Sequence, residues 1–201
     1  MIQERLKELR AQMQERGIDI YIVPTSDFHQ SEYVGEYFKA RKYMTGFTGS
    51  AGTAVITKEE AGLWTDGRYF IQAEKQLEGS TVKLFKMGEE GVPKVEEYVK
   101  DHLTEGSCIG FDGRVMDAKS GEKYAKMAEE KKAALYVKED LVGNIWKDRP
   151  QLPANKVWIL EDAYAGRSMA DRIADVRTQM QKEGADIHIL SSLYDIAWLL
   201  K

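Results

Sequence analysis

The sequence predicts a layered α/β domain, in which helices cover both faces of a mixed β-sheet. Three observations lead to this prediction. Amphipathic helical segments alternate with short apolar strands along most of the chain, which is the pattern of a sheet covered by helices. A hairpin at residues 53–65 adds an antiparallel strand, so the sheet is mixed. The composition, with 43% hydrophobic and 31% charged residues, is that of a globular protein.

The predicted elements follow one another with short connections. Apolar residues recur at three- and four-residue steps from Ile2 to Met13 and predict a helix over residues 2–16, which Gly17 ends. The later elements are assigned in the same way, from their periodicity and their flanking turn residues. They are strands at 18–23, 53–57, 63–65, 81–85, 108–112 and 134–137, helices at 68–77, 94–103 and 120–130, a polar loop with a short helix at 25–41, and an apolar tail at 141–146.

An internal repeat predicts a second, related unit. Arg5–Val23 and Arg172–Leu190 align without a gap and share nine of their nineteen residues. Each copy is predicted to form an amphipathic helix, a glycine stop and a short buried strand, which in the second copy covers residues 186–190. Only eleven residues follow the second copy, and residues 196–200 near the end of the chain are all apolar. Because chain ends are normally polar, we expect further chain to follow in the parent protein.

Two prolines mark the boundary between the two units. Pro150 and Pro153 lie within four residues of each other, as is typical of a connection between domains. We therefore expect one complete domain over residues 1–153 and the incomplete start of a related domain over residues 154–201. The apolar segment 157–160 begins this second unit.

Charge and hydropathy exclude several classes of function. A formal net charge of −4 argues against nucleic-acid binding, which needs a basic face. No apolar run approaches the roughly 18–20 residues that span a membrane, and the N-terminus lacks the apolar core of a secretion signal. The single cysteine, Cys108, lies in a predicted apolar strand, where we expect a buried, inert thiol. The absence of any possible internal disulfide favours the cytoplasm.

The glycine-rich segment 46–52 does not fit a phosphate-binding loop. Such loops lead into a helix, and the P-loop also carries a lysine, whereas here the strand 53–57 follows and no lysine is present. We expect instead that small residues let the backbone pass close to a neighbouring segment. The sequence also lacks a Gly-x-Ser-x-Gly nucleophile elbow, a His-Glu-x-x-His helix and a set of metal ligands sufficient for hydrolysis.

Asp27 and His29 place a carboxylate and an imidazole just after the first strand. Loops at this position carry ligand-binding groups in many α/β proteins. A metal site needs three or four ligands, however, and two side chains at this spacing are too few. A hydrogen bond from His29 to a neighbouring carboxylate or backbone group is therefore the favoured interpretation.

The most specific short string is Trp64–Tyr69, with the sequence Trp-Thr-Asp-Gly-Arg-Tyr. A strand with the pattern of a buried strand ends there in an Asp-Gly turn, and Arg68 follows this turn directly. An arginine on a tight turn is a rigid fork of donors, suited to a carboxylate or a peptide carbonyl. The alternative is a structural ion pair between Arg68 and either Asp66 or Glu36.

Five strings, in this order and at similar spacing, resemble the Xaa-Pro aminopeptidases, and more narrowly the three-domain cytosolic form of that family. They are His29–Tyr33, Gly46–Thr53, Trp64–Tyr69, Asn144–Pro150 and Asp195–Leu199. The resemblance implies that the first domain and the start of the second share the creatinase N-terminal fold. It further implies a third, "pita-bread" catalytic domain, absent from this chain, which holds two divalent ions, commonly manganese. There a metal-bound water attacks the bond before a proline.

The same resemblance implies roles for individual residues. Arg68 corresponds to an arginine that leans over the active site of the adjoining catalytic domain, and His29 is a weaker candidate for substrate contact. No catalytic or metal-binding residue is expected in this chain.

We therefore expect the non-catalytic N-terminal portion of a metal-dependent Xaa-Pro aminopeptidase, inactive alone, that contributes to substrate gating and dimerisation. Its partners would be proline-containing peptides, its own catalytic domain and a second subunit in a cytoplasmic homodimer, with no nucleic acid and no membrane. The alternative is a stand-alone peptide- or protein-binding module of the same fold, without enzymatic activity. We also expect the apolar face of residues 168–190 to pair with a second copy of the chain.

Overall fold

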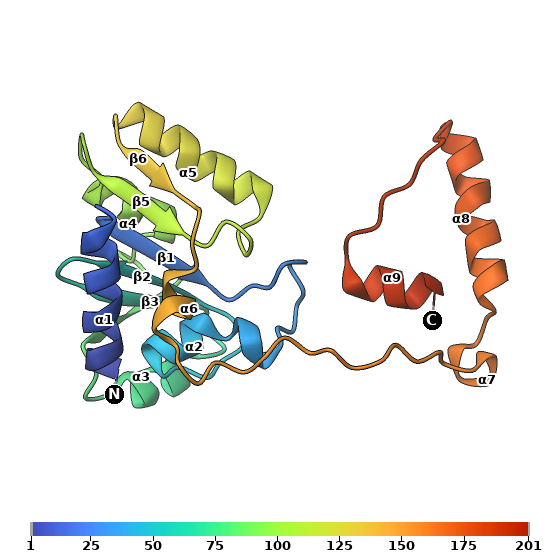
Figure 1. The fold of residues 1–201 in the computed structure, drawn as a ribbon, viewed down its shortest axis with the longest axis horizontal. Coiled ribbons are helices and arrows are strands. Elements are labelled where there is room, and N and C mark those ends of the chain that lie inside the picture. The colour runs from blue at the N-terminus through green and yellow to red at the C-terminus, as the bar shows by residue number, and fades with distance from the viewer. Residues whose placement is uncertain (1, 201) are drawn as a thin grey trace. The chain divides into compact units, whose positions relative to one another are not determined.

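The structure is a computed structural model that describes residues 2–200 (Figure 1). The chain divides into two compact units. The first comprises the chain up to Phe28 together with Glu32–Leu152, and the second comprises His29–Ser31 and the chain from Pro153 onward. Residues 149–161, between the last helix of the first unit and the first helix of the second, have no regular secondary structure.

Within the described residues, the first unit is built on a six-stranded sheet with the order β4-β3-β2-β1-β5-β6. β2 is antiparallel to both of its neighbours, whereas the pairs β3–β4, β1–β5 and β5–β6 are parallel. All strands except β2 therefore run in one direction, and their C-terminal ends lie along one edge of the sheet, here called the carboxyl edge. The strands are β1 (Ile20–Pro24), β2 (Thr53–Thr57), β3 (Ala61–Thr65), β4 (Val82–Lys86), β5 (Cys108–Phe111) and β6 (Ala134–Tyr136).

Helices cover both faces of this sheet, and each face has its own apolar core (Figure 1). One core receives α1 (Ile2–Glu15), α2 (Ala40–Thr45), α3 (Phe70–Leu77) and α6 (Leu141–Ile145), and the other receives α4 (Val95–His102) and α5 (Ala118–Glu130). The alternation of side chains along a strand explains this division. In β1, Tyr21 and Val23 join the first core, whereas Ile20 and Ile22 join the second. The predicted fold class, a mixed sheet between helices, is confirmed.

Three local features differ from the predicted boundaries or refine them. The segment 141–146, expected as an apolar tail, forms α6, because the Asp140 carboxylate caps it by accepting a hydrogen bond from Gly143 N at 2.8 Å. The helix expected from residue 68 begins at Phe70, because Tyr69 N bonds to Asp66 O at 3.0 Å and closes a turn first. The hairpin turn of β2 and β3 is closed by the Thr57 hydroxyl, which accepts from Glu60 N at 2.9 Å.

The second unit contains α7 (Asp162–Ala165), α8 (Met169–Glu183) and α9 (Leu193–Leu200). Gly184 ends α8 with a φ of 64°, in the left-handed conformation that glycine adopts readily. The prediction of a strand over residues 186–190 is wrong, because this segment forms no ladder with any described strand. A strand requires a neighbour for its backbone donors and acceptors, and Ile187 and Ile189 are 79% and 84% exposed.

Candidate functional site

A cavity of about 140 Å³ lies at the carboxyl edge of the first unit's sheet. Thr25, just after β1, contributes to its wall, together with parts of segment 32–42 and of segment 48–50. Because Pro24 of β1 pairs with Thr53 of β2, the loops leaving β1 and entering β2 start side by side. The fold thereby brings Glu32 and Tyr33, the end of the first string, to the same edge as the second string, 46–53.

The base of the cavity is organised by Arg41, a buried residue of α2 that is only 3% exposed. Its Nε donates to the Thr25 hydroxyl at 3.0 Å, its Nη1 donates to Phe47 O at 2.5 Å, and its Nη2 donates to Gly49 O. Burial lowers the pKa of Arg41 to about 10. One guanidinium thus cross-links the end of β1 to the glycine-rich loop and holds that loop in place. The sequence alone did not single out Arg41.

The glycine-rich loop passes close to its neighbours, as predicted. A Cβ at Gly49 would overlap the Phe47 ring, and a Cβ at Gly52 would lie 2.9 Å from Trp64 O. Gly52 also has a φ of 157°, which side chains rarely tolerate. Gly49 therefore leaves room for the Phe47 ring within the loop, and Gly52 lets the loop pack against β3.

Arg68 lies in the turn directly after β3. Its Nε donates to Asp66 Oδ1 and its Nη2 to Asp66 Oδ2, both at 2.8 Å, and its backbone N donates to Oδ1 at 3.1 Å. The Asp66 carboxylate raises the pKa of Arg68, and Tyr69 and Glu32 add to this effect. Of the two ion pairs considered from the sequence, the one with Asp66 is formed, whereas Glu36 pairs with Lys39. The Arg68 side chain still remains 70% exposed.

The Arg68 turn borders the cavity. The Tyr69 hydroxyl lies 2.7 Å from the Ser50 hydroxyl, a bond that lowers the pKa of Tyr69, and Ser50 lines the cavity. Glu32, which acts electrostatically on Arg68, lines the cavity as well. The structure therefore brings Glu32 and Tyr33 of the first string together with the second and third strings around one cavity.

His29 does not take part in this arrangement. It is exposed, it belongs to the second unit, and it does not line the cavity. Its Nδ1 lies 2.9 Å from Ser191 O, so it makes the expected hydrogen bond to a backbone group.

A second Asp-Gly-Arg turn, which the sequence analysis missed, follows β5. Arg114 donates from its backbone N to Asp112 Oδ1 at 3.1 Å, from Nε to Oδ1 at 3.0 Å and from Nη2 to Oδ2 at 3.0 Å. These are the same three bonds that Arg68 makes with Asp66. The recurrence of the tripeptide after two predicted strands was the signal that could have revealed it.

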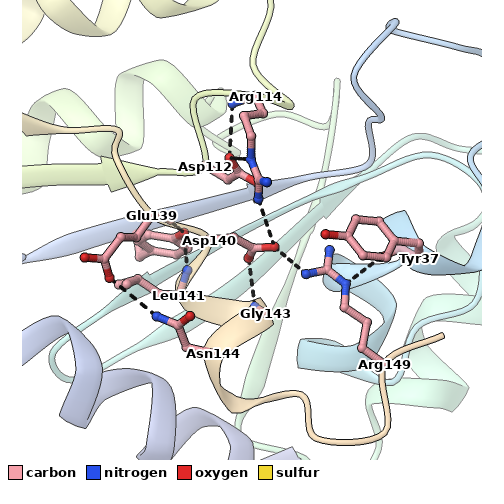
Figure 2. A network of polar contacts seen from close by, with 10 residues as sticks. Tyr37, Asp112, Arg114, Glu139, Asp140, Leu141, Gly143, Asn144 and Arg149 are labelled. Atoms are coloured by element: carbon pink, nitrogen blue, oxygen red, sulfur yellow. Dashed lines mark hydrogen bonds and ion pairs between the residues drawn. The ribbon is translucent and has the colours of Figure 1, made fainter. Parts of the chain in front are cut away.

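Arg114 belongs to a chain of alternating charges, here called the Asp140 network (Figure 2). Asp140 Oδ2 lies 3.7 Å from Arg114 Nη2 and 2.5 Å from Arg149 Nη1. Arg149 Nε in turn donates to Tyr37 O at 2.8 Å. The network joins the β5 turn, the start of α6, residue 149 and the loop after β1, and it brings the fourth string, 144–150, to the carboxyl edge.

The described part of the chain does not fit a catalytic metal centre. Among residues 2–200, no group of three or more His, Cys, Asp or Glu side chains is placed to hold a metal ion. Cys108 is buried as expected, and burial raises the pKa of its thiol, with a further contribution from Asp19. No helix in the described range is long and apolar enough to cross a membrane.

Comparison with known proteins identifies the family. Residues 5–138 match the Creatinase/Prolidase N-terminal domain, and a second model of that description matches residues 148–201. The chain belongs to the creatinase/prolidase N-terminal domain family. It is 41% identical to "Aminopeptidase P2" of Arabidopsis thaliana over 205 residues, which cover 100% of this chain and 29% of the relative. It is 44% identical to a "Probable Xaa-Pro aminopeptidase P" of Pyrenophora teres f. teres, over 97% of this chain and 30% of the relative.

Solved structures of this family show the same fold. The X-prolyl aminopeptidase of Caenorhabditis elegans, described as a cytosolic enzyme with a di-nuclear active site, is 32% identical with a TM-score of 0.88. The likeness covers 99% of this chain and 34% of that one. The Xaa-Pro dipeptidase of Bacillus anthracis is 25% identical with a TM-score of 0.52, over 72% of this chain and 36% of that one. The family resemblance expected from the five strings is confirmed, and the chain spans about a third of these relatives.

Proposed function

We propose that this chain is the non-catalytic N-terminal portion of a metal-dependent Xaa-Pro aminopeptidase. The observation that carries this proposal is the similarity to the C. elegans X-prolyl aminopeptidase, which extends over 99% of this chain but only 34% of that enzyme. The hydrolytic groups are then supplied by polypeptide outside these residues. Its two divalent ions, which we propose to be manganese, would lie there, in keeping with the di-nuclear site of the C. elegans enzyme.

In this proposal the carboxyl edge of the first unit faces the substrate. Arg68 is suited to that task because Asp66 fixes the plane of its guanidinium while the side chain stays 70% exposed. A held, exposed guanidinium can donate to a peptide carbonyl or a carboxylate without first losing side-chain entropy. The edge would thereby limit which peptides reach the catalytic domain. A cytoplasmic homodimer completes the proposal, and the cytosolic description of the C. elegans enzyme supports the location.

Substitution of Arg68 in the parent enzyme tests this role. We expect Arg68→Ala to lower kcat/KM for an Arg-Pro-Pro peptide by about 10- to 100-fold, the value of one charge-assisted hydrogen bond. Metal content should stay unchanged, because in this proposal the metal ligands lie outside these 201 residues. The matched control is Arg167→Ala, which removes another exposed arginine in an ion pair, with Asp175 at 2.6 Å. The 201-residue chain with Mn²⁺ serves as the blank and should leave the peptide intact.

Two results would contradict the proposal. An unaltered rate for Arg68→Ala would remove Arg68 from substrate contact, and cleavage by the 201-residue chain would place the catalytic groups within it. The alternative, a stand-alone binding module of the same fold, is distinguished by the coding sequence. A coding sequence that continues past the codon of Lys201 and encodes metal ligands would contradict this alternative.

A further inference from the structure

We propose that Arg149 is a positioning residue that ties residues 146–150 to the loop lining the cavity. Both lie in the first unit, 112 positions apart in sequence from Tyr37 to Arg149. The inference depends on the proposed function at one point only, namely that the cavity takes part in substrate contact. The coupling itself is a property of this chain and can be measured without any peptidase activity.

Arg149 makes contacts in two directions at once (Figure 2). Its Nη1 pairs with Asp140 Oδ2 at 2.5 Å, and its Nε donates to Tyr37 O at 2.8 Å. The guanidinium also lies over the Tyr37 ring, 3.8 Å from its centroid, and 5.5 Å from the ring of Trp146. Only a planar cation with several fixed donors can stack on a ring and bond two partners in this way. The side chain is 14% exposed, so water screens these contacts weakly.

Asp140, the partner of Arg149, is itself held firmly. Its Oδ1 caps α6 by accepting from Gly143 N at 2.8 Å. The residues on either side of it are fixed to the sheet, because the Tyr21 hydroxyl donates to Glu139 O at 3.2 Å and accepts from Leu141 N at 3.0 Å. Arg149 is therefore anchored to a rigid part of the core.

The packing at Gly143 shows that the fold reserves space for this arginine. A Cβ at Gly143 would lie 2.5 Å from Arg149 Nη1 and 2.8 Å from Asp140 Oδ2. Gly143 sits inside α6, where glycine costs about 1 kcal/mol relative to alanine and no left-handed conformation requires it. The glycine therefore accommodates the Arg149–Asp140 pair and serves no turn.

The other end of the connection reaches the cavity through aromatic packing. The Tyr37 ring packs edge-on against Phe38 at 5.0 Å, and Phe28 packs against Phe38 at 4.7 Å. Phe38 lines the cavity, as do Glu32 and Tyr33 of the same loop. Removing Arg149 takes away a backbone hydrogen bond and a stacking partner from Tyr37. The loop should then open more often while the sheet remains intact.

Hydrogen–deuterium exchange of the 201-residue chain tests this coupling. In Arg149→Gln, we expect the amides of residues 32–39 to exchange about tenfold faster, as the loss of one charge-assisted bond predicts. Amides of β1 and β2 should keep the wild-type rate. Arg149→Lys keeps the positive charge near Asp140 but loses the stacking and the second donor direction. The amides of residues 32–39 should therefore exchange faster than in the wild type in this variant as well.

The matched control is Arg16→Gln. Arg16 pairs with Glu139 at 2.8 Å, next to Asp140, and its side chain is 20% exposed. Its other side-chain hydrogen bonds go to Gln12 and Glu15 of α1 and to Tyr136 of β6. The substitution should leave residues 32–39 at the wild-type rate. A wild-type rate for residues 32–39 in Arg149→Gln would overturn the proposal, as would equal acceleration in Arg16→Gln.

Gly143→Ala, together with the Arg149→Lys variant described above, keeps the coupling testable should Arg149→Gln fail to fold. Gly143→Ala and Arg149→Lys both disturb the placement of the guanidinium, so each should accelerate exchange in residues 32–39. A wild-type rate in both variants would overturn the proposal in the same way. Failure of the Arg68 test alone would leave these exchange rates unaffected.

Discussion

Arg68 and Arg114 occupy the same Asp-Gly-Arg turn but have different surroundings. Each makes three bonds to the aspartate two residues earlier, so the tripeptide itself determines the local geometry. Arg114 also lies 3.7 Å from Asp140, a second carboxylate, and its side chain is 55% exposed. Arg68 has one carboxylate partner at hydrogen-bond distance and stays 70% exposed. The sequence could predict the turn, but only the arrangement of β3, β5 and α6 decides which arginine remains available.

Arg41 is the residue whose loss should weaken the first unit most directly at the cavity. In Arg41→Met, the Thr25 hydroxyl and two loop carbonyls lose their donor inside the fold. We expect the free energy of unfolding to fall by about 2–4 kcal/mol, the cost of leaving buried acceptors unpaired. Urea unfolding followed by circular dichroism measures this change. Lys42→Met, an exposed change on the same helix, is the control; an equal midpoint for both variants would contradict the prediction.

At the level of elements, periodicity predicted most of the first unit, because a long amphipathic pattern survives any tertiary context. α1 ends within a residue of its predicted end, and the hairpin of β2 and β3 lies in its predicted segment. Elements that depend on partners were predicted less well. α6 is only five residues long and exists because Asp140 caps it and Tyr21 holds it. Residues 186–190 have the apolar pattern of β1 but no neighbouring strand, and so form none.

The N-cap of α5 predicts how the stability of this element depends on pH. Asp117 accepts from Ser120 N at 2.9 Å, and this hydrogen bond lowers the pKa of Asp117. A pKa lower in the folded state means that the cap stabilises the fold above the unfolded pKa, near 3.9, and loses this effect as the pH falls through the folded value. We expect Asp117→Ala to cost about 1 kcal/mol near pH 7 and less below about pH 3.

Denaturant unfolding of wild type and Asp117→Ala at both pH values measures this difference. The control is Glu122→Gln, an exposed change on the same helix. A difference between wild type and Asp117→Ala that stays constant from neutral to acidic pH would show that the charge of the cap plays no part.

At the level of the whole molecule, sequence and structure agree on the fold of the first unit, and in the second unit they differ at residues 186–190, where no strand forms. Three of the five strings lie at strand ends or in loops, whereas Asn144–Pro150 begins in α6 and Asp195–Leu199 lies within α9. Four of the five strings contribute to the cavity, the Arg68 turn or the Asp140 network. The internal repeat gave α8 and its glycine stop correctly. The repeat could not predict whether the apolar residues of this unit are buried, because burial depends on contacts with other parts of the protein.

Exposed apolar side chains of the second unit predict that the isolated chain associates. Trp158, Ile187 and Ile189 are 72%, 79% and 84% exposed, and contact with a second copy would remove this apolar surface from water. We expect the light-scattering mass to rise above the monomer value of 22.9 kDa as the concentration increases from about 1 to 100 µM. Replacing both isoleucines, Ile187→Ser with Ile189→Ser, should shift this rise to higher concentration. Ile71→Ser is the control: it removes another exposed isoleucine, 71% exposed, from α3 of the first unit and should leave the association unchanged. A monomeric mass for the unaltered chain at every concentration would show that these side chains do not drive self-association.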